Sequence, residues 1–322
     1  MTVRASVVVP TYKRPDLLHR CLGALMAQDL EPSAWEVIVA DDAASPDTQR
    51  LVSKWAELAK PVLRYVPVSG PHGPAAARNV GWRSARGEII AFTDDDTVPD
   101  PAWLRQGVAA LEAGADAAWG RIRMPLPERP TDYERNEAGL EHAEFATANC
   151  FCRRSALDAL GGFDERFGMA WREDADLYFS LLEAGYRVMY APQALVVHPV
   201  RPARWGVSLG QQRKAQFNAL LYKKHPSLYR EKIQRQPPWH YYGCAAGVLT
   251  TAVGLAVGLP VLTVAGAGSW LLLTGRFCQR RLRGTTQTPR HIAEMVVTSA
   301  AIPLLSIYWR LRGALRFRVL FL

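Results

Sequence analysis

Short apolar runs of strand length alternate with segments of helical periodicity along the first part of the chain. The runs lie at 6–10, 36–40, 62–68 and 88–92. After the first run, apolar residues recur at helical spacing on one face, namely Leu17, Leu18, Cys21, Leu22, Leu25 and Met26. After the second run the same spacing recurs at Leu51, Val52, Trp55 and Leu58. Apolar strands that alternate with amphipathic helices predict an α/β fold, with a mostly parallel sheet flanked by helices.

Polar residues follow three of these predicted strands. Thr11 follows the first, Asp41 and Asp42 follow the second, and the triplet Asp94–Asp96 follows the strand at 88–92. In parallel sheets ligands bind beyond the carboxyl ends of the strands, so we expect these side chains to share one edge. Three adjacent carboxylates repel one another unless a cation offsets their charge. Mg²⁺ and Mn²⁺ are held by carboxylates together with phosphate oxygens, which predicts a metal–diphosphate site.

Five sequence blocks follow one another in a recognisable order. They are Ser6–Pro15, Asp41-Asp42, Gly73–Glu88 with Arg78, the triplet Asp94–Asp96, and Gly161–Leu177 with Glu173-Asp174. In this order they resemble the family 2 glycosyltransferases of the GT-A, Rossmann-like fold, and the resemblance covers roughly residues 3 to 200. The chain has Ala43-Ala44-Ser45 where the family often has Gly-Ser, a departure that leaves both acids in place.

The resemblance implies a nucleotide-sugar donor and assigns residues to it. Thr11, Asp41, Asp42 and Arg78 would bind the nucleotide, while Asp94 and Asp95 would complete the donor site. The Asp-x-Asp motif fits the triplet, so that Asp96 would bind Mg²⁺ or Mn²⁺ with help from Asp94. Some GT-A enzymes supply a late histidine to the metal, and His198, which follows the apolar stretch 194–197, fits that place.

The same resemblance assigns the catalytic role to Asp174. Its carboxylate would take the proton of the acceptor hydroxyl as that hydroxyl attacks the anomeric carbon, which makes the enzyme inverting. Glu173 and Asp176 are the alternatives, one and two residues away. A further departure lies at Trp205 and Gln211-Gln212-Arg213, where the order and spacing do not match the signature of processive synthases.

The last third of the chain has a different composition. Residues 241–275 contain no Asp, Glu, Lys or Arg over 35 positions, whereas a membrane span needs about 20 apolar residues. Gly258 and Pro260 interrupt the run, so it is either one span with an apolar extension or a hairpin of two helices that turns near Leu259. We therefore expect a catalytic domain at 1–238 and a membrane-associated helical region at 239–322.

Charge is concentrated at the C-terminal end. The chain carries +9 overall, and residues 276–322 account for +8 of it, with nine Arg and one acid, Glu294. A basic tail can bind nucleic acid or anionic lipid, and the adjacent apolar run favours lipid. A weaker apolar run at 292–309 is broken by Pro303, and 309–322 has the composition of an interfacial helix.

Other features give further expectations. The first residues lead into a strand without a signal peptide, so we expect the catalytic domain to stay in the cytoplasm. The five cysteines (21, 150, 152, 244 and 278) lack zinc spacing and are expected to be reduced and structural. Residues 121–146 hold three prolines, and we expect them to be irregular and to line the acceptor side.

The chain is therefore expected to be a membrane-anchored, metal-dependent inverting glycosyltransferase. Its acceptor would be a lipid-linked or cell-envelope glycan held near the bilayer. A nucleotidyltransferase would need a Gly-rich phosphate loop, and Tyr12–Pro15 has no glycine. The alternative outside enzymes is a membrane scaffold that binds nucleotide-sugars without turnover, and Asp174 beside the metal motif argues against it.

Overall fold

The structure is a computed structural model that describes residues 3–321. The chain divides into two compact units. The N-terminal unit comprises Met1–Pro125 and Gly139–Val200, and the C-terminal unit comprises Leu126–Ala138 and Arg201–Leu322. The border that we expect at residue 238 separates two functions, catalysis and membrane association, and it stays a prediction.

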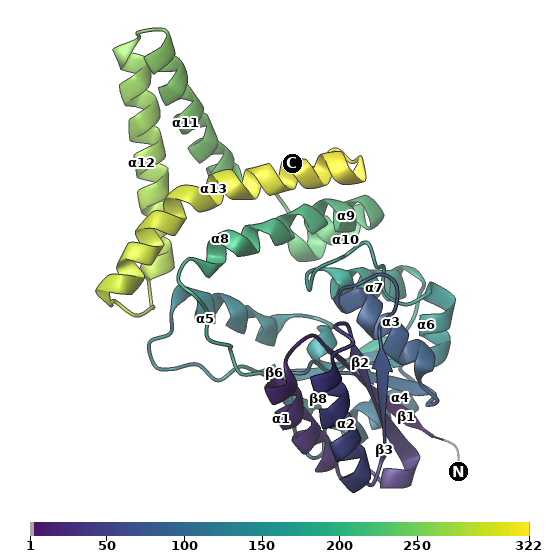
Figure 1. Ribbon diagram of the computed structural model, residues 1–322. Helices are drawn as coiled ribbons and strands as arrows, with labels where there is room; N and C mark the ends of the chain where they lie inside the picture. The colour runs from purple at the N-terminus through teal and green to yellow at the C-terminus, as the bar shows by residue number, and fades with distance from the viewer. Residues whose placement is uncertain (1–2, 322) are drawn as a thin grey trace. The chain divides into compact units, whose positions relative to one another are not determined.

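An eight-stranded mixed sheet lies at the centre of the N-terminal unit (Figure 1). Its strands are β1 (Ala5–Thr11), β2 (Trp35–Asp41), β3 (Val62–Pro67), β4 (Ile89–Phe92), β5 (Val98–Pro99), β6 (Ala117–Arg123), β7 (Cys150–Arg153) and β8 (Val188–Val197), in the order β3-β2-β1-β4-β7-β6-β8-β5. Strands β3, β2, β1 and β4 are parallel, as are β6 and β8, whereas β7 is antiparallel to both neighbours and β5 to β8. The α/β fold predicted from the sequence is confirmed. One half of the sheet is parallel, and the other half contains the antiparallel strands β7 and β5.

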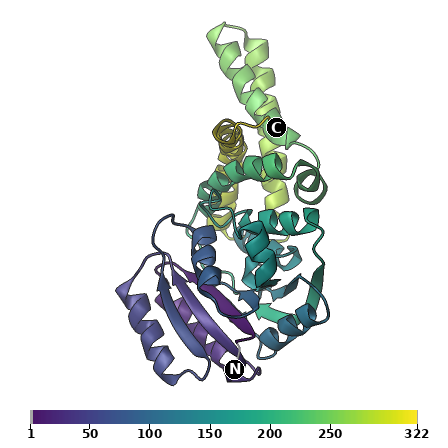
Figure 2. The same ribbon diagram turned by 90° about the vertical axis from the view of Figure 1, so that its right-hand side faces the viewer.

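Helices cover both faces of this sheet (Figures 1 and 2). They are α1 (Pro15–Met26), α2 (Pro46–Leu58), α3 (Pro74–Ser84), α4 (Trp103–Glu112), α6 (Arg154–Leu160) and α7 (Glu173–Glu183), with short 3-10 turns η1 (Pro32–Ala34), η2 (Ala138–His142) and η3 (Thr147–Asn149). Buried side chains of α1, α2 and α4 form one core with alternate residues of the strands, such as Val7 and Val9.

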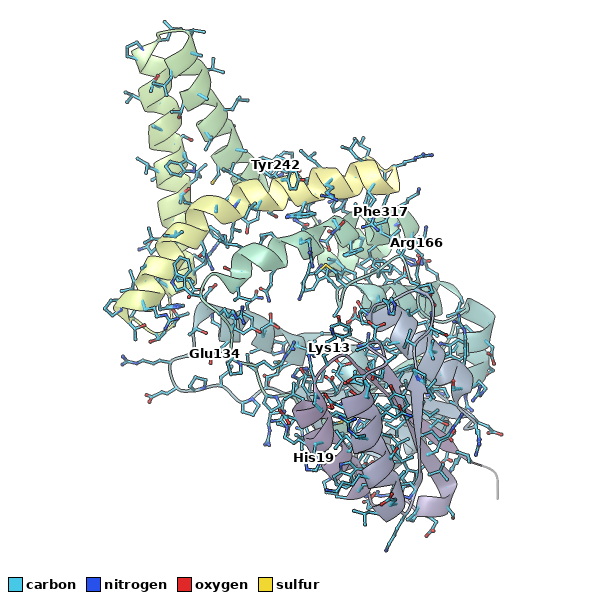
Figure 3. The ribbon with its side chains drawn as sticks, in the orientation of Figure 1. Lys13, His19, Glu134, Arg166, Tyr242 and Phe317 are labelled. Atoms are coloured by element: carbon cyan, nitrogen blue, oxygen red, sulfur yellow. The ribbon has the colours of Figure 1, made fainter. Side chains whose placement is uncertain are left out.

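Helix α3 packs closely against the other face of the sheet. The side chain of Val8, which lies between Val7 and Val9 in β1, points to this face. A Cβ atom on Gly81 would lie 2.4 Å from Val8 Cγ1, so only glycine lets the helix approach this far. This close approach places Arg78, one turn earlier on α3, at the end of the sheet. On the face covered by α1 and α2, Trp55 of α2 donates to Nδ1 of His19 of α1 over 3.0 Å. Figure 3 labels His19 among the side chains of this unit.

The segment expected to be irregular, 121–146, is partly regular. Its first residues complete β6, and Asp132–Glu137 form helix α5, followed by η2. A capping box begins α5, because Thr131 Oγ1 accepts from the amide of Glu134 while Glu134 Oε2 accepts from the amide of Thr131. The Thr-x-x-Glu spacing is visible in the sequence, whereas the expectation of irregular structure rests on the prolines alone.

The C-terminal unit is helical. Besides α5 it contains α8 (Val207–Gln211), η4 (Gln212–Ala215), α9 (Gln216–Lys224), α10 (Pro226–Leu228), the π-helical turn η5 (Tyr229–Ile233), α11 (Trp239–Ala256), α12 (Pro260–Leu282) and α13 (Pro289–Phe317). Two of these helices, α12 and α13, are long and apolar enough to cross a membrane by length and composition.

Helices α11 and α12 form the hairpin, one of the two arrangements left open by the sequence, and they lie side by side in both views (Figures 1 and 2). The turn lies at Leu259, as expected for that arrangement. Small residues bring the helices together, since a Cβ on Gly266 would lie 2.5 Å from the Thr251 amide nitrogen and one on Gly254 2.5 Å from that of Thr263. Small residues at a helix–helix contact are typical of membrane-embedded helices.

Helix α13 differs from the expectation. It runs through Pro303 without ending, so that the apolar run at 292–309 and the start of the expected interfacial helix form one helix. Its last part packs on α9, where a Cβ on Gly313 would lie 2.3 Å from the backbone oxygen of Gln216. Arg310 is buried and donates to Gln234 over 3.0 Å. Part of the basic charge in 276–322 is therefore internal.

Candidate active site

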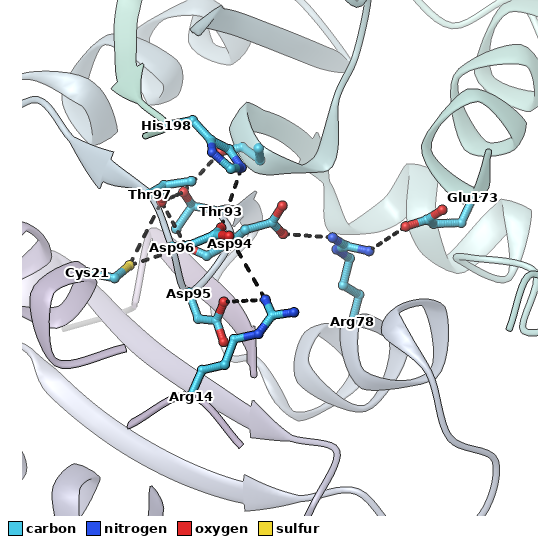
Figure 4. A network of polar contacts seen from close by, with 11 residues as sticks. Arg14, Cys21, Arg78, Thr93, Asp94, Asp95, Asp96, Thr97, Glu173 and His198 are labelled. Carbon is cyan, nitrogen blue, oxygen red and sulfur yellow. Dashed lines mark hydrogen bonds and ion pairs between the residues drawn. The ribbon is translucent and has the colours of Figure 1, made fainter. Parts of the chain in front are cut away.

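Side chains that follow β1, β4 and β8 meet at one end of the sheet (Figure 4). They come from the loop after β1, from the Asp94–Asp96 triplet after β4 and from His198, directly after β8. The strands β1 and β4 are adjacent and parallel, which brings Thr11 and the triplet together as the sequence pattern predicts.

Asp95 connects the triplet to the end of β1. It is buried, and its Oδ2 atom accepts from the Thr11 hydroxyl over 2.7 Å, while Arg14 Nη1 lies 3.4 Å from Oδ1. Burial raises the pKa of Asp95 to about 6, and the neighbouring charge of Asp96 acts in the same direction. Thr11 and Asp95 thus join two strand ends, and Arg14 adds a cation that the sequence analysis did not single out.

Asp94, Asp96 and His198 form a candidate metal site. One ligand atom from each lies within 4.8 Å of the others. The Nε2 atom of His198 is 3.4 Å from Asp96 Oδ1. The other ring nitrogen, Nδ1, is buried without a hydrogen-bond partner within residues 3–321. Two carboxylates and an imidazole are donors that a divalent cation accepts, so the residues present fit the Mg²⁺ or Mn²⁺ that the motif implies.

Arg78 connects this cluster to helix α7. Its Nη2 atom donates to Asp94 Oδ1 over 2.7 Å and its Nη1 atom to Glu173 Oε1 over 2.9 Å (Figure 4). Arg78 and Glu173 are both buried, and Asp94 is half-buried. The second carboxylate oxygen of Glu173 is buried without a partner within the described residues. Burial raises the pKa of Glu173 to about 7 against the opposing attraction of Arg78.

The three acids considered for catalysis lie at the beginning of α7 and differ in burial. Asp174 is half-buried, whereas Glu173 and Asp176 are buried. Asp174 Oδ1 accepts from the amide of Ala175 over 2.7 Å, and burial raises the pKa of Asp174 above its ordinary value. Arg172, the residue before the helix, adopts a left-handed backbone conformation with φ of 78°. Asp174 is therefore the least buried of the three acids.

Asp41 has hydrogen-bond partners within the protein. It is fully buried, and its oxygens accept from the amides of Ala43 and Ser45 over 3.0 and 2.7 Å, and from the hydroxyl of Tyr65 over 3.0 Å. Asp41 thus holds the loop in which Ala43-Ala44-Ser45 replaces the usual Gly-Ser. Ala44 in that loop has a φ of 47°.

Asp42 also has partners within the protein. Both of its carboxylate oxygens accept from the amide of Gly73, over 3.2 and 3.0 Å, and His72 Nδ1 lies 3.0 Å from Oδ1. Asp42 therefore holds the loop before α3, the helix that carries Arg78. In this arrangement Asp41 and Asp42 shape two loops that border the site.

Three further residues at the site were missed in the sequence analysis. Arg20 Nη2 donates to the backbone oxygen of Asp96 over 3.2 Å, and the Cys21 thiol lies 3.5 Å from the backbone oxygen of Asp94. Thr97 Oγ1 donates to the same Asp94 oxygen over 2.8 Å. These contacts fix the backbone of the triplet. Arg20 and Cys21 lie on α1, and no spacing in the sequence indicates that they reach a loop more than 70 residues away.

Comparison with known proteins gives a consistent result. A model of glycosyl transferase family 2 matches residues 6–163, and a model of glycosyl transferase family group 2 matches residues 89–309. The succinoglycan biosynthesis protein ExoM of Rhizobium meliloti is 30% identical over 272 residues, which are 79% of this chain and 85% of that protein. The glycosyltransferase AglE of Haloferax volcanii is 27% identical over 226 residues, 66% of this chain and 70% of that protein.

The fold is shared with solved structures. The mannosyltransferase PcManGT of Pyrobaculum calidifontis, solved in complex with GDP-Man and Mn²⁺, superposes with a TM-score of 0.59 at 22% identity, covering 99% of this chain and 88% of that one. At this identity the likeness shows the GT-A fold alone. The chain spans between 17% and 70% of the length of the first curated relatives that it matches.

Proposed function

Because the chain belongs to glycosyltransferase family 2, we propose that it is a membrane-anchored, metal-dependent inverting enzyme that moves a sugar from a nucleotide-sugar donor to a hydroxyl of a lipid-linked or cell-envelope glycan. One observation carries the proposal. The cluster of Asp94, Asp96 and His198 is joined through Arg78 to the start of the helix that bears Asp174. The hydrogen bonds of Arg78 thus connect the proposed leaving-group site to Glu173, the residue before the candidate base.

The donor would lie along the carboxyl end of β1, β2 and β4. Arg78 carries a planar guanidinium suited to phosphate or to base oxygens, and it would exchange Asp94 or Glu173 for the donor, since it is bonded to both. Asp94 is the half-buried acid of the triplet. Four of the residues assigned to the donor have internal partners, namely Thr11, Asp95, Asp41 and Asp42. They would either hold the loops of the donor site in position or exchange a partner when the donor binds. The GDP-Man in the mannosyltransferase structure supports a nucleotide-sugar as the ligand class.

Asp94, Asp96 and His198 would hold Mg²⁺ or Mn²⁺ beside the diphosphate. A divalent cation at this place would neutralise the charge that develops on the departing nucleoside diphosphate. The imidazole of His198 and the carboxylates of the two aspartates are the donors available to it.

Asp174 would act on the acceptor. Its carboxylate takes the proton of the acceptor hydroxyl while the hydroxyl oxygen forms a bond to the anomeric carbon of the sugar. The bond from that carbon to the diphosphate oxygen breaks, and the nucleoside diphosphate leaves with the electron pair. A single displacement of this kind inverts the anomeric configuration. The raised pKa of Asp174 makes it a stronger base than an ordinary aspartate once it is ionised.

The membrane part of the proposal rests on the hairpin α11–α12. Large apolar side chains near its turn are exposed, among them Leu255, Val257 and Val261 at 67%, 58% and 81%. Exposed apolar surface of this kind marks a membrane or protein contact. The exposed part of the +8 charge of residues 276–322 suits the anionic lipid of the cytoplasmic leaflet, which would leave the catalytic part in the cytoplasm.

A panel of nucleotide-sugars tests the proposal. The full chain in detergent is incubated with each donor and Mn²⁺ or Mg²⁺, and donor hydrolysis and the shift in thermal midpoint are recorded. We expect one donor to be hydrolysed and to raise the midpoint only when the metal is present, since a bound ligand stabilises the folded state. Binding of a donor without hydrolysis or transfer to any acceptor extract would favour a non-catalytic scaffold instead.

A further inference from the structure

The C-terminal unit contains a cavity of about 240 Å³. Four segments form it, namely α5 with the preceding residue, the loop from Arg201 into α8, the end of α12 and the first turns of α13. Its lining is Thr131, Asp132, Tyr133, Glu134, Arg201, Pro202, Ala203, Arg204, Val207, Ser208, Arg281, His291, Glu294 and Met295. No family motif contains these residues, although Thr131–Glu134 belong to the segment 121–146 that we expect on the acceptor side.

Hydrogen bonds from within the unit already satisfy the acids of this lining. Asp132 Oδ2 accepts from Arg281 Nε and Nη2 over 3.0 and 2.8 Å. Glu134 Oε2 accepts from the amide and the hydroxyl of Thr131. Glu294 Oε1 accepts from the amide of Gly206 over 2.7 Å. The acids of the cavity are therefore poor candidates for holding a cation.

The side chains of the lining that still lack hydrogen-bond partners can act as donors. His291 is 4% exposed and lines the cavity, and both of its ring nitrogens are buried without a partner within the described residues. A buried imidazole without partners is costly unless a ligand or water supplies them. Arg204, also in the lining, is exposed, and its side chain makes no ion pair or hydrogen bond within residues 3–321. Because His291 and Arg204 can donate hydrogen bonds while the carboxylates of the lining already have partners, the cavity fits an anion.

We propose that this cavity binds the phosphate of an anionic lipid headgroup, with Arg204 and His291 as its donors. The choice of a lipid over free phosphate follows from the helices that carry the cavity. Arg281 lies near the end of α12 and His291 in the first turn of α13, and these are the two helices long and apolar enough to cross a membrane. The cavity therefore lies at polar ends of apolar helices, where headgroups are found. This proposal does not depend on the sugar-transfer reaction.

Binding of a short-chain phosphatidic acid to the full chain in detergent tests this inference. Calorimetry is run with dioctanoyl phosphatidic acid below its micelle concentration and, separately, with inorganic phosphate. We expect saturable binding of the lipid and at least tenfold weaker binding of inorganic phosphate. Equal affinity for the two would overturn the assignment to a lipid headgroup, and absence of saturable lipid binding would overturn the site.

Three variants locate the binding. Arg204→Gln and His291→Phe, the second of which keeps the ring volume while removing both nitrogens, are each expected to weaken lipid binding about tenfold, the usual effect of losing one charge-assisted hydrogen bond. Arg290→Gln is the matched control, because Arg290 is exposed, precedes His291 and does not line the cavity. It should change affinity less than twofold. Equal losses in Arg204→Gln and Arg290→Gln would show diffuse attraction to the basic tail and refute the cavity.

Discussion

Arg78 Nη1 lies 2.9 Å from Glu173 Oε1, and both side chains are buried. The pair joins α3 to the start of α7, and its other guanidinium nitrogen holds Asp94 of the candidate metal site. A buried ion pair of this kind contributes little net stability over a well-packed apolar pair, but it fixes which elements face one another. Here it sets the distance between the carboxylates proposed to hold the metal and Asp174.

Asp96→Ala is expected to weaken metal-dependent binding of a nucleoside diphosphate more than about tenfold, because it removes a proposed metal ligand. Calorimetry with the diphosphate and Mn²⁺ measures the effect. Asp47→Ala, at an exposed acid of α2, is the control and should bind as the unaltered chain does. Unchanged affinity in Asp96→Ala would remove Asp96 from the metal site.

Asp174→Asn should leave donor binding nearly intact and lower turnover by about 10²- to 10⁴-fold, the range for loss of a general base. Steady-state kinetics on the acceptor and calorimetry on the donor separate the two effects. If Asp174→Asn remains fully active, Glu173→Gln and Asp176→Asn become the variants to examine, since these acids lie beside it. An equal loss of donor affinity and turnover would move Asp174 out of the base role.

The raised pKa of Glu173 predicts a pH dependence of stability. Between its ordinary value of 4.5 and about 7, the folded state binds more protons at this group than the unfolded state does. Stability therefore falls as the pH rises through this window. The thermal midpoint of the full chain in detergent and chelator should be lower at pH 8 than at pH 5, with Glu173 contributing at most about 3 kcal/mol.

Glu173→Gln isolates that contribution, since the amide does not titrate. The difference in midpoint between pH 5 and pH 8 should be smaller in this variant than in the unaltered chain. Because Asp95 also has a raised pKa, some pH dependence should remain. Identical pH profiles for the two proteins would mean that Glu173 titrates in its ordinary range.

Two glycines on α12 give a matched test of the hairpin. A Cβ on Gly266 would lie 2.5 Å from the backbone nitrogen of Thr251, whereas one on Gly268 would meet nothing within 4 Å. Gly266→Ala should push α11 and α12 apart and destabilise the hairpin by about 1–3 kcal/mol, as overpacking does. Gly268→Ala should be neutral or slightly stabilising, because alanine favours a helix. Thermal midpoints in detergent compare the variants, and equal midpoints for both would contradict the observed packing.

Membrane attachment predicts that the full chain resists both high-salt and carbonate washes and needs detergent for release. Lysines at Leu255, Val257 and Val261 should increase its extraction by carbonate, because each costs about 2.5–3.5 kcal/mol within a bilayer. Leu58→Lys, at a position of α2 that is 73% exposed, controls for added charge. Release of the unaltered chain by salt alone would show that the hairpin does not enter the membrane.

The periodicity of the sequence was sufficient to predict the elements that position the site. Strands β1, β2 and β4 end within a residue or two of the predicted places, because apolar runs define strands and the polar residues after them define the edge. The position of the triplet beside Thr11 follows from parallel pairing of β1 with β4, which an α/β pattern implies.

The side-chain partners could not be predicted in the same way. Asp41 is held by Tyr65 and Asp42 by Gly73, and each contact depends on the packing of elements more than 20 residues apart. The connection from Asp94 through Arg78 to Glu173 spans 95 residues, and the sequence records no spacing rule for it. Likewise, nothing in the run of arginines distinguishes the buried Arg310 from the exposed Arg290.

All five cysteines are free and buried, as expected from their spacing. Burial raises the pKa of the Cys21 and Cys152 thiols, so that little thiolate is available to react with an alkylating reagent at neutral pH. The native cysteines should therefore react little with a thiol-labelling reagent. A single cysteine placed at an exposed position of the hairpin turn, such as Val257, could carry a fluorophore whose colour reports the depth of the turn in a bilayer, without removal of any native cysteine.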